Sequence, residues 1–194
     1  MPKPCLQIVI GSTRPGRVGL PVAQWFAQRA REHAGFEVEL VDLAEVNLPL
    51  LDEPNHPRLY QYTHEHTRAW SATVAHGEAY VFVHPEYNYG LNAALKNAID
   101  YLFGEWQYKA VGFVSYGGVS GGLRAVQMIK QVVTALKMVP VQEAVTVPFV
   151  AKFIDDEGRF EATPILDASA TALLEELAEV TAALSPLREE ASGG

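Results

Sequence analysis

The stretch Ala79-Tyr80-Val81-Phe82-Val83-His84, followed at once by Pro85-Glu86-Tyr87-Asn88-Tyr89-Gly90, decides the fold of this chain. The first six residues form an apolar run that predicts a buried strand, and the next six form a turn rich in Pro, Asn and Gly. A helical pattern follows from Asn92 to Leu102, with Asn92 as its expected N-cap. Strand, short turn and helix together make half of a βαβ unit.

The turn itself is unusual because Tyr87 and Tyr89 stand where small polar residues are common. Planar rings, the carboxylate of Glu86 and backbone amides at the end of a strand favour a surface that holds a flat ligand. The alternative is a turn whose tyrosines only cover the end of the sheet. The turn alone leaves both interpretations open.

Strands and helices alternate along the whole chain. Apolar runs predict further strands at 5–10, 36–43, 109–115 and 139–149, and helical spacing predicts helices at 18–34, 63–76, 92–102, 123–138 and 167–184. Such alternation predicts an α/β fold, a mostly parallel sheet with helices on both faces. Five strands and five helices suit a flavodoxin-like three-layer sandwich of strand order 2-1-3-4-5. We expect a single domain over residues 1–184 and a flexible tail at 185–194.

The composition excludes several classes of protein. A net charge of −8, from 15 Lys and Arg against 23 Asp and Glu, argues against a nucleic-acid or anionic-membrane partner. Cys5 is the single cysteine, so no internal disulfide can form, which fits a reducing compartment. No stretch approaches the roughly 20 apolar residues of a membrane span, and Gln7 and Gly11 interrupt the first apolar run. We therefore expect no signal peptide and a cytoplasmic protein.

Three unusual turns are expected to meet at one edge of the sheet. In a sheet of this order, ligands bind beyond the carboxyl ends of the strands, where the strand order reverses. The turns 11–17, 85–90 and 116–122 all leave strand ends there. The first, Gly11-Ser12-Thr13-Arg14-Pro15-Gly16-Arg17, offers hydroxyl groups, two guanidinium groups and a following helix N-terminus, which favours a phosphate cradle. It is neither a Walker A loop nor G-x-G-x-x-G, and the alternative is a turn with surface arginines.

Two further parts of the sequence are weaker candidates for a functional site. The segment His64-Glu65-His66-Thr67-Arg68 looks briefly like a zinc motif, but its fifth residue is Arg68 and two histidines two positions apart do not share a helix face. We expect a solvated helix there and no metal site in the chain. Cys5 lies in a predicted buried strand with no activating group nearby in the sequence, so we expect it to serve packing only.

Together the three loops resemble the NAD(P)H-dependent FMN reductase family, which includes chromate and quinone reductases and azoreductase-like flavoproteins. Residues 11–17 are similar to the G-S-x-R phosphate loop of that family. Residues 85–90 and the helix sequence L-K-N-A-I-D-Y-L at 95–102 are similar to its flavin-ring motif, and residues 116–122 to its third loop. The correspondence extends over most of the chain, to roughly residue 150.

The resemblance implies a bound FMN and assigns residues to it. Its phosphate would be held by Ser12, Arg14 and Arg17, with backbone amides near Val18 and Gly19. Its isoalloxazine ring would be lined by Pro85, Glu86, Tyr87, Asn88 and Tyr89, with Ser115, Tyr116, Gly117 and Gly118 against the pyrimidine side. Two positions depart from the family pattern: Arg17 stands where many members have Ser, and His84 where many have a small polar residue.

The resemblance also implies an activity. A hydride would pass from NADPH or NADH to N5 of FMN and then, in a ping-pong cycle, to a quinone, an azo compound, a metal oxyanion or a flavin. Amides and the helix N-terminus at 115–122 would stabilise negative charge near the N1–C2 region, and no acid or base side chain is nominated as catalytic. Homodimers or homotetramers with the flavin near the interface are implied as well. The alternative is a flavodoxin-like electron carrier or FMN-binding module without NAD(P)H turnover.

Overall fold

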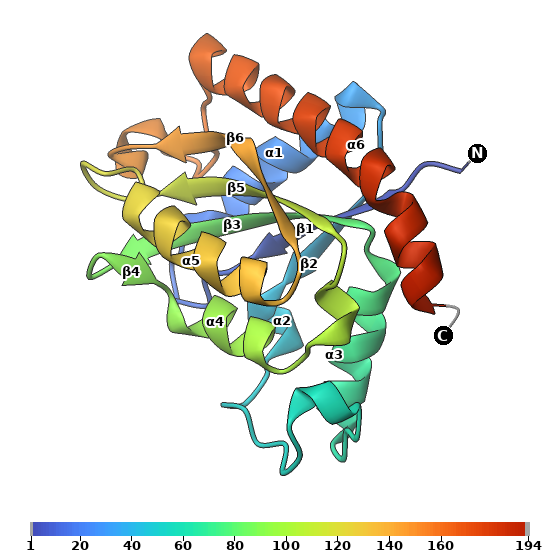
Figure 1. Ribbon diagram of the computed structural model, residues 1–194. Coiled ribbons are helices and arrows are strands. Elements are labelled where there is room, and N and C mark those ends of the chain that lie inside the picture. Colours follow the sequence, from blue (N-terminus) through green and yellow to red (C-terminus); the bar gives the residue numbers. More distant parts are fainter. Residues whose placement is uncertain (1, 193–194) are drawn as a thin grey trace.

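The computed structural model describes residues 2–192, which form a parallel sheet between two layers of helices (Figure 1). The strands are β1 Cys5–Ile10, β2 Glu37–Asp42, β3 Ala79–Tyr87, β5 Ala110–Tyr116 and β6 Val139–Val147. Their order is β2-β1-β3-β5-β6, and a short β4, Gly90–Leu91, pairs antiparallel with the end of β3. Apart from β4, this is the predicted order 2-1-3-4-5, and the flavodoxin-like α/β fold is confirmed.

The helices cover both faces of the sheet. Helices α1 (Gly19–His33) and α6 (Pro164–Ser192) lie on one face, whereas α3 (Glu65–His76), α4 (Ala93–Asp100), α5 (Leu123–Ala135) and the short α2 (Leu43–Val46) lie on the other (Figure 1). Three 3₁₀ turns occupy connections: η1 Pro57–Leu59, η2 Gly104–Trp106 and η3 Val150–Phe153. Within residues 2–192, no helix is both long enough and apolar enough to cross a membrane.

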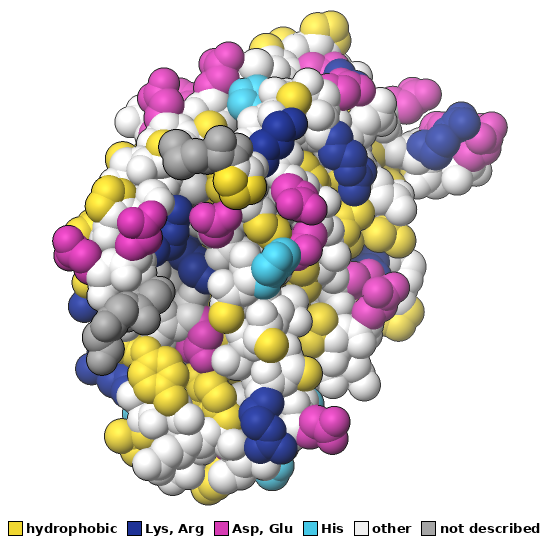
Figure 2. Space-filling model, turned by 90° about the vertical axis from the view of Figure 1, so that its right-hand side faces the viewer, with side chains coloured by type: hydrophobic (Ala, Val, Ile, Leu, Met, Phe, Trp, Pro, Cys, Tyr) yellow, Lys and Arg dark blue, Asp and Glu magenta, His cyan; other side chains and the backbone are white. Residues whose placement is uncertain are grey.

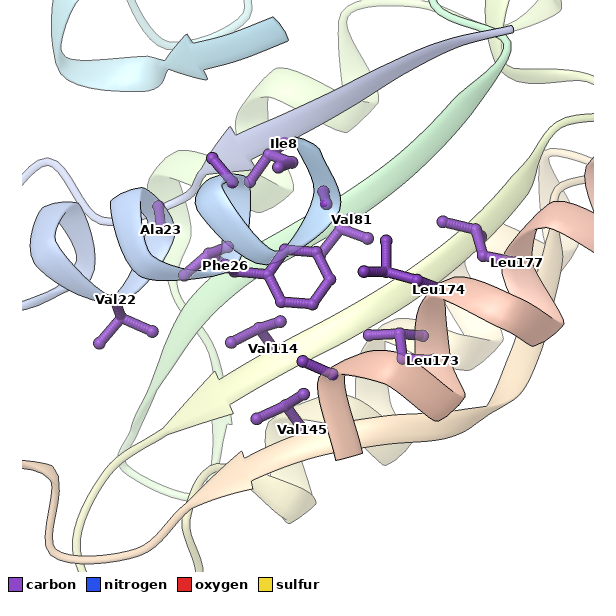
Figure 3. Close-up of a cluster of buried hydrophobic side chains, with 14 of the residues drawn as sticks. Ile8, Val22, Ala23, Phe26, Val81, Val114, Val145, Leu173, Leu174 and Leu177 are labelled. Carbon is purple, nitrogen blue, oxygen red and sulfur yellow. The ribbon is translucent and has the colours of Figure 1, made fainter. Parts of the chain in front are cut away.

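The strands feed two separate cores because successive side chains point to opposite faces. In β1, Ile8 belongs to the core under α1 and α6, whereas Val9 belongs to the core under α3, α4 and α5. Figure 3 shows the first of these cores, where Phe26 of α1 and Leu173 of α6 pack over the strands. Strands buried on both faces are continuous apolar runs, which is why β1, β3 and β5 were recognisable in the sequence.

Strand β3 extends three residues further than predicted. Pro85, Glu86 and Tyr87 belong to the strand, so the predicted six-residue turn is reduced to Asn88 and Tyr89, with φ of 50° and 69°. Left-handed backbone at both central residues is the geometry of a type I′ hairpin. A proline can lie at this point because β1 pairs with β3 only as far as Val83, so Pro85 is beyond the end of that ladder.

The last helix also differs from the prediction. Residues 185–192, expected in a flexible tail, continue α6 to Ser192, and residues 193–194 lie outside the described part of the chain. A mostly buried arginine side chain ties this extension to the body of the protein. Arg188 donates to the carbonyl oxygens of Tyr108 at 3.3 Å and Thr181 at 3.2 Å, and its side chain lies 3.6 Å from Glu78. The polar sequence of residues 185–192 did not indicate these contacts, because they join residues far apart in the chain.

Candidate functional site

The three loops meet at the carboxyl end of the strands, where they enclose a pocket of about 140 Å³. Larger hollows exist elsewhere, including one of about 630 Å³ beside Lys109, but the small pocket is where the three loops come together. Nine predicted site residues line it: Ser12, Arg14, Arg17, Val18, Pro85, Glu86, Tyr87, Tyr116 and Gly117. Val150, which the sequence analysis did not single out, completes the lining.

The first loop leaves an uncapped helix end facing this pocket. Gly11 donates its amide to the carbonyl oxygen of Val83 at 2.9 Å, and the amide of Arg17 bonds the carbonyl oxygen of Arg14 at 3.1 Å. Helix α1 then begins at Gly19, and its N-cap residue Val18 makes no capping bond through its side chain. The first amides of a helix have no partner inside the helix, and the helix dipole is positive there. This end of α1 therefore suits an anion.

The two arginines of the first loop have different surroundings. Arg17 forms an ion pair with Asp42 at the end of β2, and both side chains are mostly buried. Arg14 is exposed and has no ion pair within residues 2–192. The guanidinium of Arg17 is thus fixed in place and partly neutralised, whereas the charge of Arg14 remains available to a ligand.

Tyr116 places a buried hydroxyl beside the same loop. The residue is 4% exposed, and its Oη has no hydrogen-bond partner in the described part of the chain. A Cβ at Gly19 would lie 2.4 Å from this oxygen, so the hydroxyl packs directly on the first residue of α1. Burial raises the pKa of the Tyr116 phenol, which keeps it protonated as a donor. An unpaired buried donor next to an uncapped helix end fits the phosphate or sugar-alcohol chain of a nucleotide-like ligand.

The carboxylate of Glu86 stabilises the fold and is not free to react with a ligand. Its carboxylate accepts the backbone amide of Arg124 at 3.0 Å and forms an ion pair with that side chain. Burial works against ionisation, but hydrogen bonds from Arg124 and Ser120 outweigh it, so the pKa of Glu86 lies below its ordinary value. The carboxylate therefore fastens the start of α5 to β3, and the backbone of Glu86 is what remains for a ligand.

Arg124 was missed by the sequence analysis, although the sequence carried a signal for it. Its guanidinium carbon lies 3.7 Å from the ring centroid of Tyr89, so one side chain joins Glu86 and the hairpin. A cation in the first turn of a helix is unfavourable against the helix dipole. Its position two residues after Gly122, in the first turn of α5, thus indicated a nearby carboxylate.

Asn92 links the second loop to the first. It was expected to cap the following helix, but its side chain makes no capping bond there. Its Nδ2 donates instead to the carbonyl oxygen of Gly11 at 2.6 Å, and its buried Oδ1 has no partner among the residues that the structure describes. The tertiary contact replaces the local cap because the α4 N-terminus packs against the first loop.

The third loop is shaped by internal bonds. Ser115 is buried and donates its hydroxyl to the carbonyl oxygen of Gly121 at 2.9 Å, so its side chain supports the loop. Gly122 has a φ of 92°, and a Cβ there would lie 2.9 Å from the amide nitrogen of Tyr116, which only glycine avoids. The remaining predicted site residues are neighbours of the lining residues in sequence without lining the pocket themselves: Gly19, Asn88, Tyr89, Ser115 and Gly118.

His84 lies under the second loop in full burial. Its Nδ1 is 3.2 Å from the carbonyl oxygen of Pro85, its ring meets Phe113 edge-on, and its Nε2 has no partner in the described residues. Burial lowers the pKa of His84 to about 4, so the imidazole is neutral near pH 7.

Comparisons with known proteins identify the family and the fold of this chain. The family described as NADPH-dependent FMN reductase matches residues 6–152. An NAD(P)H-dependent FMN reductase of Schizosaccharomyces pombe is 40% identical over 149 residues, covering 75% of this chain and 74% of that protein. An NAD(P)H:quinone oxidoreductase of Solanum tuberosum is 31% identical over 104 residues, half of each chain. The solved structure of the flavoenzyme FerB of Paracoccus denitrificans, an NAD(P)H:(acceptor) oxidoreductase, has a TM-score of 0.71 at 20% identity, covering 91% of this chain and 98% of that chain, which shows the fold.

Proposed function

The chain belongs to the NADPH-dependent FMN reductase family, and we propose that it is an NAD(P)H-dependent oxidoreductase that holds FMN in the pocket between its three loops. The observation that supports this placement is the convergence of an unpaired buried hydroxyl, an uncapped helix end and an unpaired arginine at the switch point of the sheet. The family match favours this enzyme over an electron carrier without turnover.

The chemistry that FMN supplies when bound is hydride transfer, from NADPH or NADH to a second substrate. The protein's own groups bind and orient. Ser12, Arg14 and Arg17, with the amides near Val18 and Gly19, hold the phosphate. The backbone of residues 85–89 lines the ring, and residues 115–118 lie against its pyrimidine side, where amides and the α5 N-terminus favour negative charge.

The titratable side chains nearest the hairpin are not available for proton transfer. Glu86 is ion-paired with Arg124, and His84 is buried and does not line the pocket. The chain therefore contributes position, electrostatic stabilisation and shielding from water. This division of labour suits a reaction whose bond changes occur on cofactor and substrate.

We extend the proposal to the acceptor, the assembly and the location. Tyr87 and Tyr89 expose 42% and 71% of their surface and offer ring faces to a small planar acceptor, with a quinone first and an azo compound, a metal oxyanion or free flavin as further members of the class. Exposed apolar side chains beside the hairpin, Leu123 and Met128, support a homodimer or homotetramer. A net charge of −8 and a single buried cysteine support a cytoplasmic protein without nucleic-acid or membrane partners.

Charge deletion in the first loop tests the placement of FMN. We expect Arg14→Ala to weaken FMN binding about 10- to 100-fold, the size of one lost hydrogen bond to a charged group, and the double variant with Arg17→Ala to weaken it further. Arg31→Ala, an exposed arginine at the other end of α1, is the matched control and should bind FMN as the parent does. Fluorescence titration of flavin-free protein measures the affinities. Unchanged affinity in the double variant would refute the phosphate assignment.

A further inference from the structure

The amino end of the sheet, opposite the proposed flavin pocket, gathers a second set of chemistry-bearing side chains. Cys5 is the first residue of β1, Glu39 lies in β2, and His76 is the last residue of α3. The Cys5 Sγ lies 3.7 Å from the His76 Nδ1, which is in turn 3.2 Å from a carboxylate oxygen of Glu39. The three potential ligand atoms all lie within 4.8 Å of one another.

The fold brings these groups together from distant parts of the sequence. Strands β1 and β2 are parallel neighbours, with Gln7 paired to Glu39 in register. The Gln7 side chain is buried, and its Nε2 donates to a carboxylate oxygen of Glu39 at 3.1 Å and to the carbonyl oxygen of Thr73 at 2.7 Å. A buried amide that orients a carboxylate is the usual supporting contact of a metal ligand. The other oxygen of this amide, Oε1, is buried and has no partner in residues 2–192.

Two of the three separations between these atoms are close to those of a tetrahedral zinc site. With Zn–S of about 2.3 Å and Zn–N and Zn–O of about 2.1 Å, tetrahedral angles place sulfur and nitrogen about 3.6 Å apart and nitrogen and oxygen about 3.4 Å apart. The corresponding distances here are 3.7 Å and 3.2 Å. We propose that Cys5, Glu39 and His76 bind a zinc-type divalent cation, with the fourth position open to water.

The charges around the thiol favour a cation at this position. The carboxylates of Glu39, Glu37 and Glu78 lie around the thiol of Cys5. A divalent cation neutralises such a site, and binding would release the thiol proton to solvent. Thiolate with imidazole selects zinc over magnesium or calcium, which prefer oxygen ligands.

The site is also reachable from solvent. The side chains of His76 and Glu39 are 62% and 41% exposed, whereas Cys5 is buried behind them. Figure 2 looks onto the side of the molecule where the strands begin and shows acidic side chains interspersed with basic ones and with histidine. The sequence analysis expected only packing for Cys5, because its partner His76 is 71 positions away in the chain.

Metal titration of tag-free, FMN-loaded protein tests the proposal, after treatment with a chelator. We expect one zinc per chain in competition with a chromophoric chelator. Cobalt should produce an absorption band from sulfur-to-metal charge transfer. The band is measured in a difference spectrum against the same flavin-loaded protein without cobalt. Cys5→Ser should abolish this band and weaken zinc binding at least tenfold. His66→Gln, which removes a half-buried histidine paired with Asp52 at 2.9 Å, is the matched control and should change nothing.

His76→Gln keeps the test decisive if the buried Cys5→Ser variant fails to fold, because His76 is exposed. It should also weaken zinc binding at least tenfold, with an unchanged circular dichroism spectrum and flavin content. Zinc binding that both variants retain, without charge transfer from cobalt, would show adventitious binding and overturn the proposal. The proposal would also be overturned if the parent protein bound no zinc. The three side chains would then form only a hydrogen-bonded group. Neither outcome depends on the flavin placement.

Discussion

At the amino end of the sheet Tyr80 donates its hydroxyl to the carbonyl oxygen of Val74, whereas at the carboxyl end the hydroxyl of Tyr116 has no partner within residues 2–192. The buried basic side chains at the two ends of the sheet differ in the same way. Lys109 Nζ donates to the carbonyl oxygens of Val74 at 2.8 Å and Ala75 at 3.3 Å. His84 at the other end keeps an unpaired Nε2 in full burial.

This difference separates an end completed by folding from the end at which we propose that a ligand binds. An unpaired buried polar group costs about 1–3 kcal/mol, so it persists only where something else favours it. At the carboxyl end Tyr116, His84 and Asn92 all carry such atoms. Gln7 Oε1 and His33 Nδ1 are exceptions at the amino end, and Gln7 Oε1 lies beside the thiol, imidazole and carboxylate that we propose as a metal site.

The largest effect should come from removing His84. Its pKa is lowered to about 4 in the folded state by burial, so between about pH 6.5 and pH 4 the unfolded chain binds the proton and the folded chain does not. His84 therefore makes the free energy of unfolding fall by about 3 kcal/mol as the pH drops through this range. His84→Leu should lose this part of the pH dependence, measured by urea unfolding of flavin-free protein. Parallel profiles for parent and variant would contradict the neutral, buried histidine.

The two tyrosines allow a direct exchange test. Tyr80→Phe removes a bond to Val74 that folding has already made, and the Val74 carbonyl keeps Lys109 as a donor, so we expect a loss of about 0.5–1.5 kcal/mol in the free energy of unfolding. Tyr116→Phe removes an unpaired hydroxyl, so the flavin-free protein should keep or slightly gain stability, while FMN affinity falls. Denaturant unfolding and FMN titration of both variants measure the two effects. Equal destabilisation by both substitutions would remove the distinction between the ends.

A smaller effect concerns backbone strain, which can be tested on one tyrosine at each end of the sheet. Tyr89 and Tyr108 have φ of 69° and 57°, and a cation lies over each ring, Arg124 and Lys137 respectively. Glycine relieves left-handed strain but removes the ring beneath the cation and adds entropy to the unfolded chain, so Tyr89→Gly and Tyr108→Gly should each change the free energy of unfolding by less than about 1 kcal/mol. Thermal unfolding measures this change, and steady-state kinetics with a quinone should change only in Tyr89→Gly. A kinetic change in both variants would show that Tyr89 has no special role at the pocket.

The sequence predicted the strand order and the three loops because their signals are local. Apolar runs mark strands buried on both faces, and glycines with adjacent hydroxyls or aromatic rings mark the turns that follow. The pairs that shape the pocket were beyond such reasoning. Arg17 meets Asp42, Glu86 meets Arg124 and Asn92 meets Gly11, at sequence separations of 25, 38 and 81 residues. Which polar side chain finds which partner is decided by tertiary packing, and the same holds for Cys5 and His76.

The strand order also has a consequence for the time at which the protein can acquire its ligand. Strand β3 pairs with both β1 and β5, and Val150, which lines the pocket, follows the last strand. A nascent chain on the ribosome thus cannot complete the pocket until Val150 has been synthesised. Parallel pairing between distant segments is slow, so cofactor capture should be a late event in biogenesis. A ligand present at 100 times its dissociation constant adds about 2.7 kcal/mol to the free energy of unfolding. Only chains that have completed the sheet gain this stability. Flavin supply would thereby control how much newly made protein survives proteolysis.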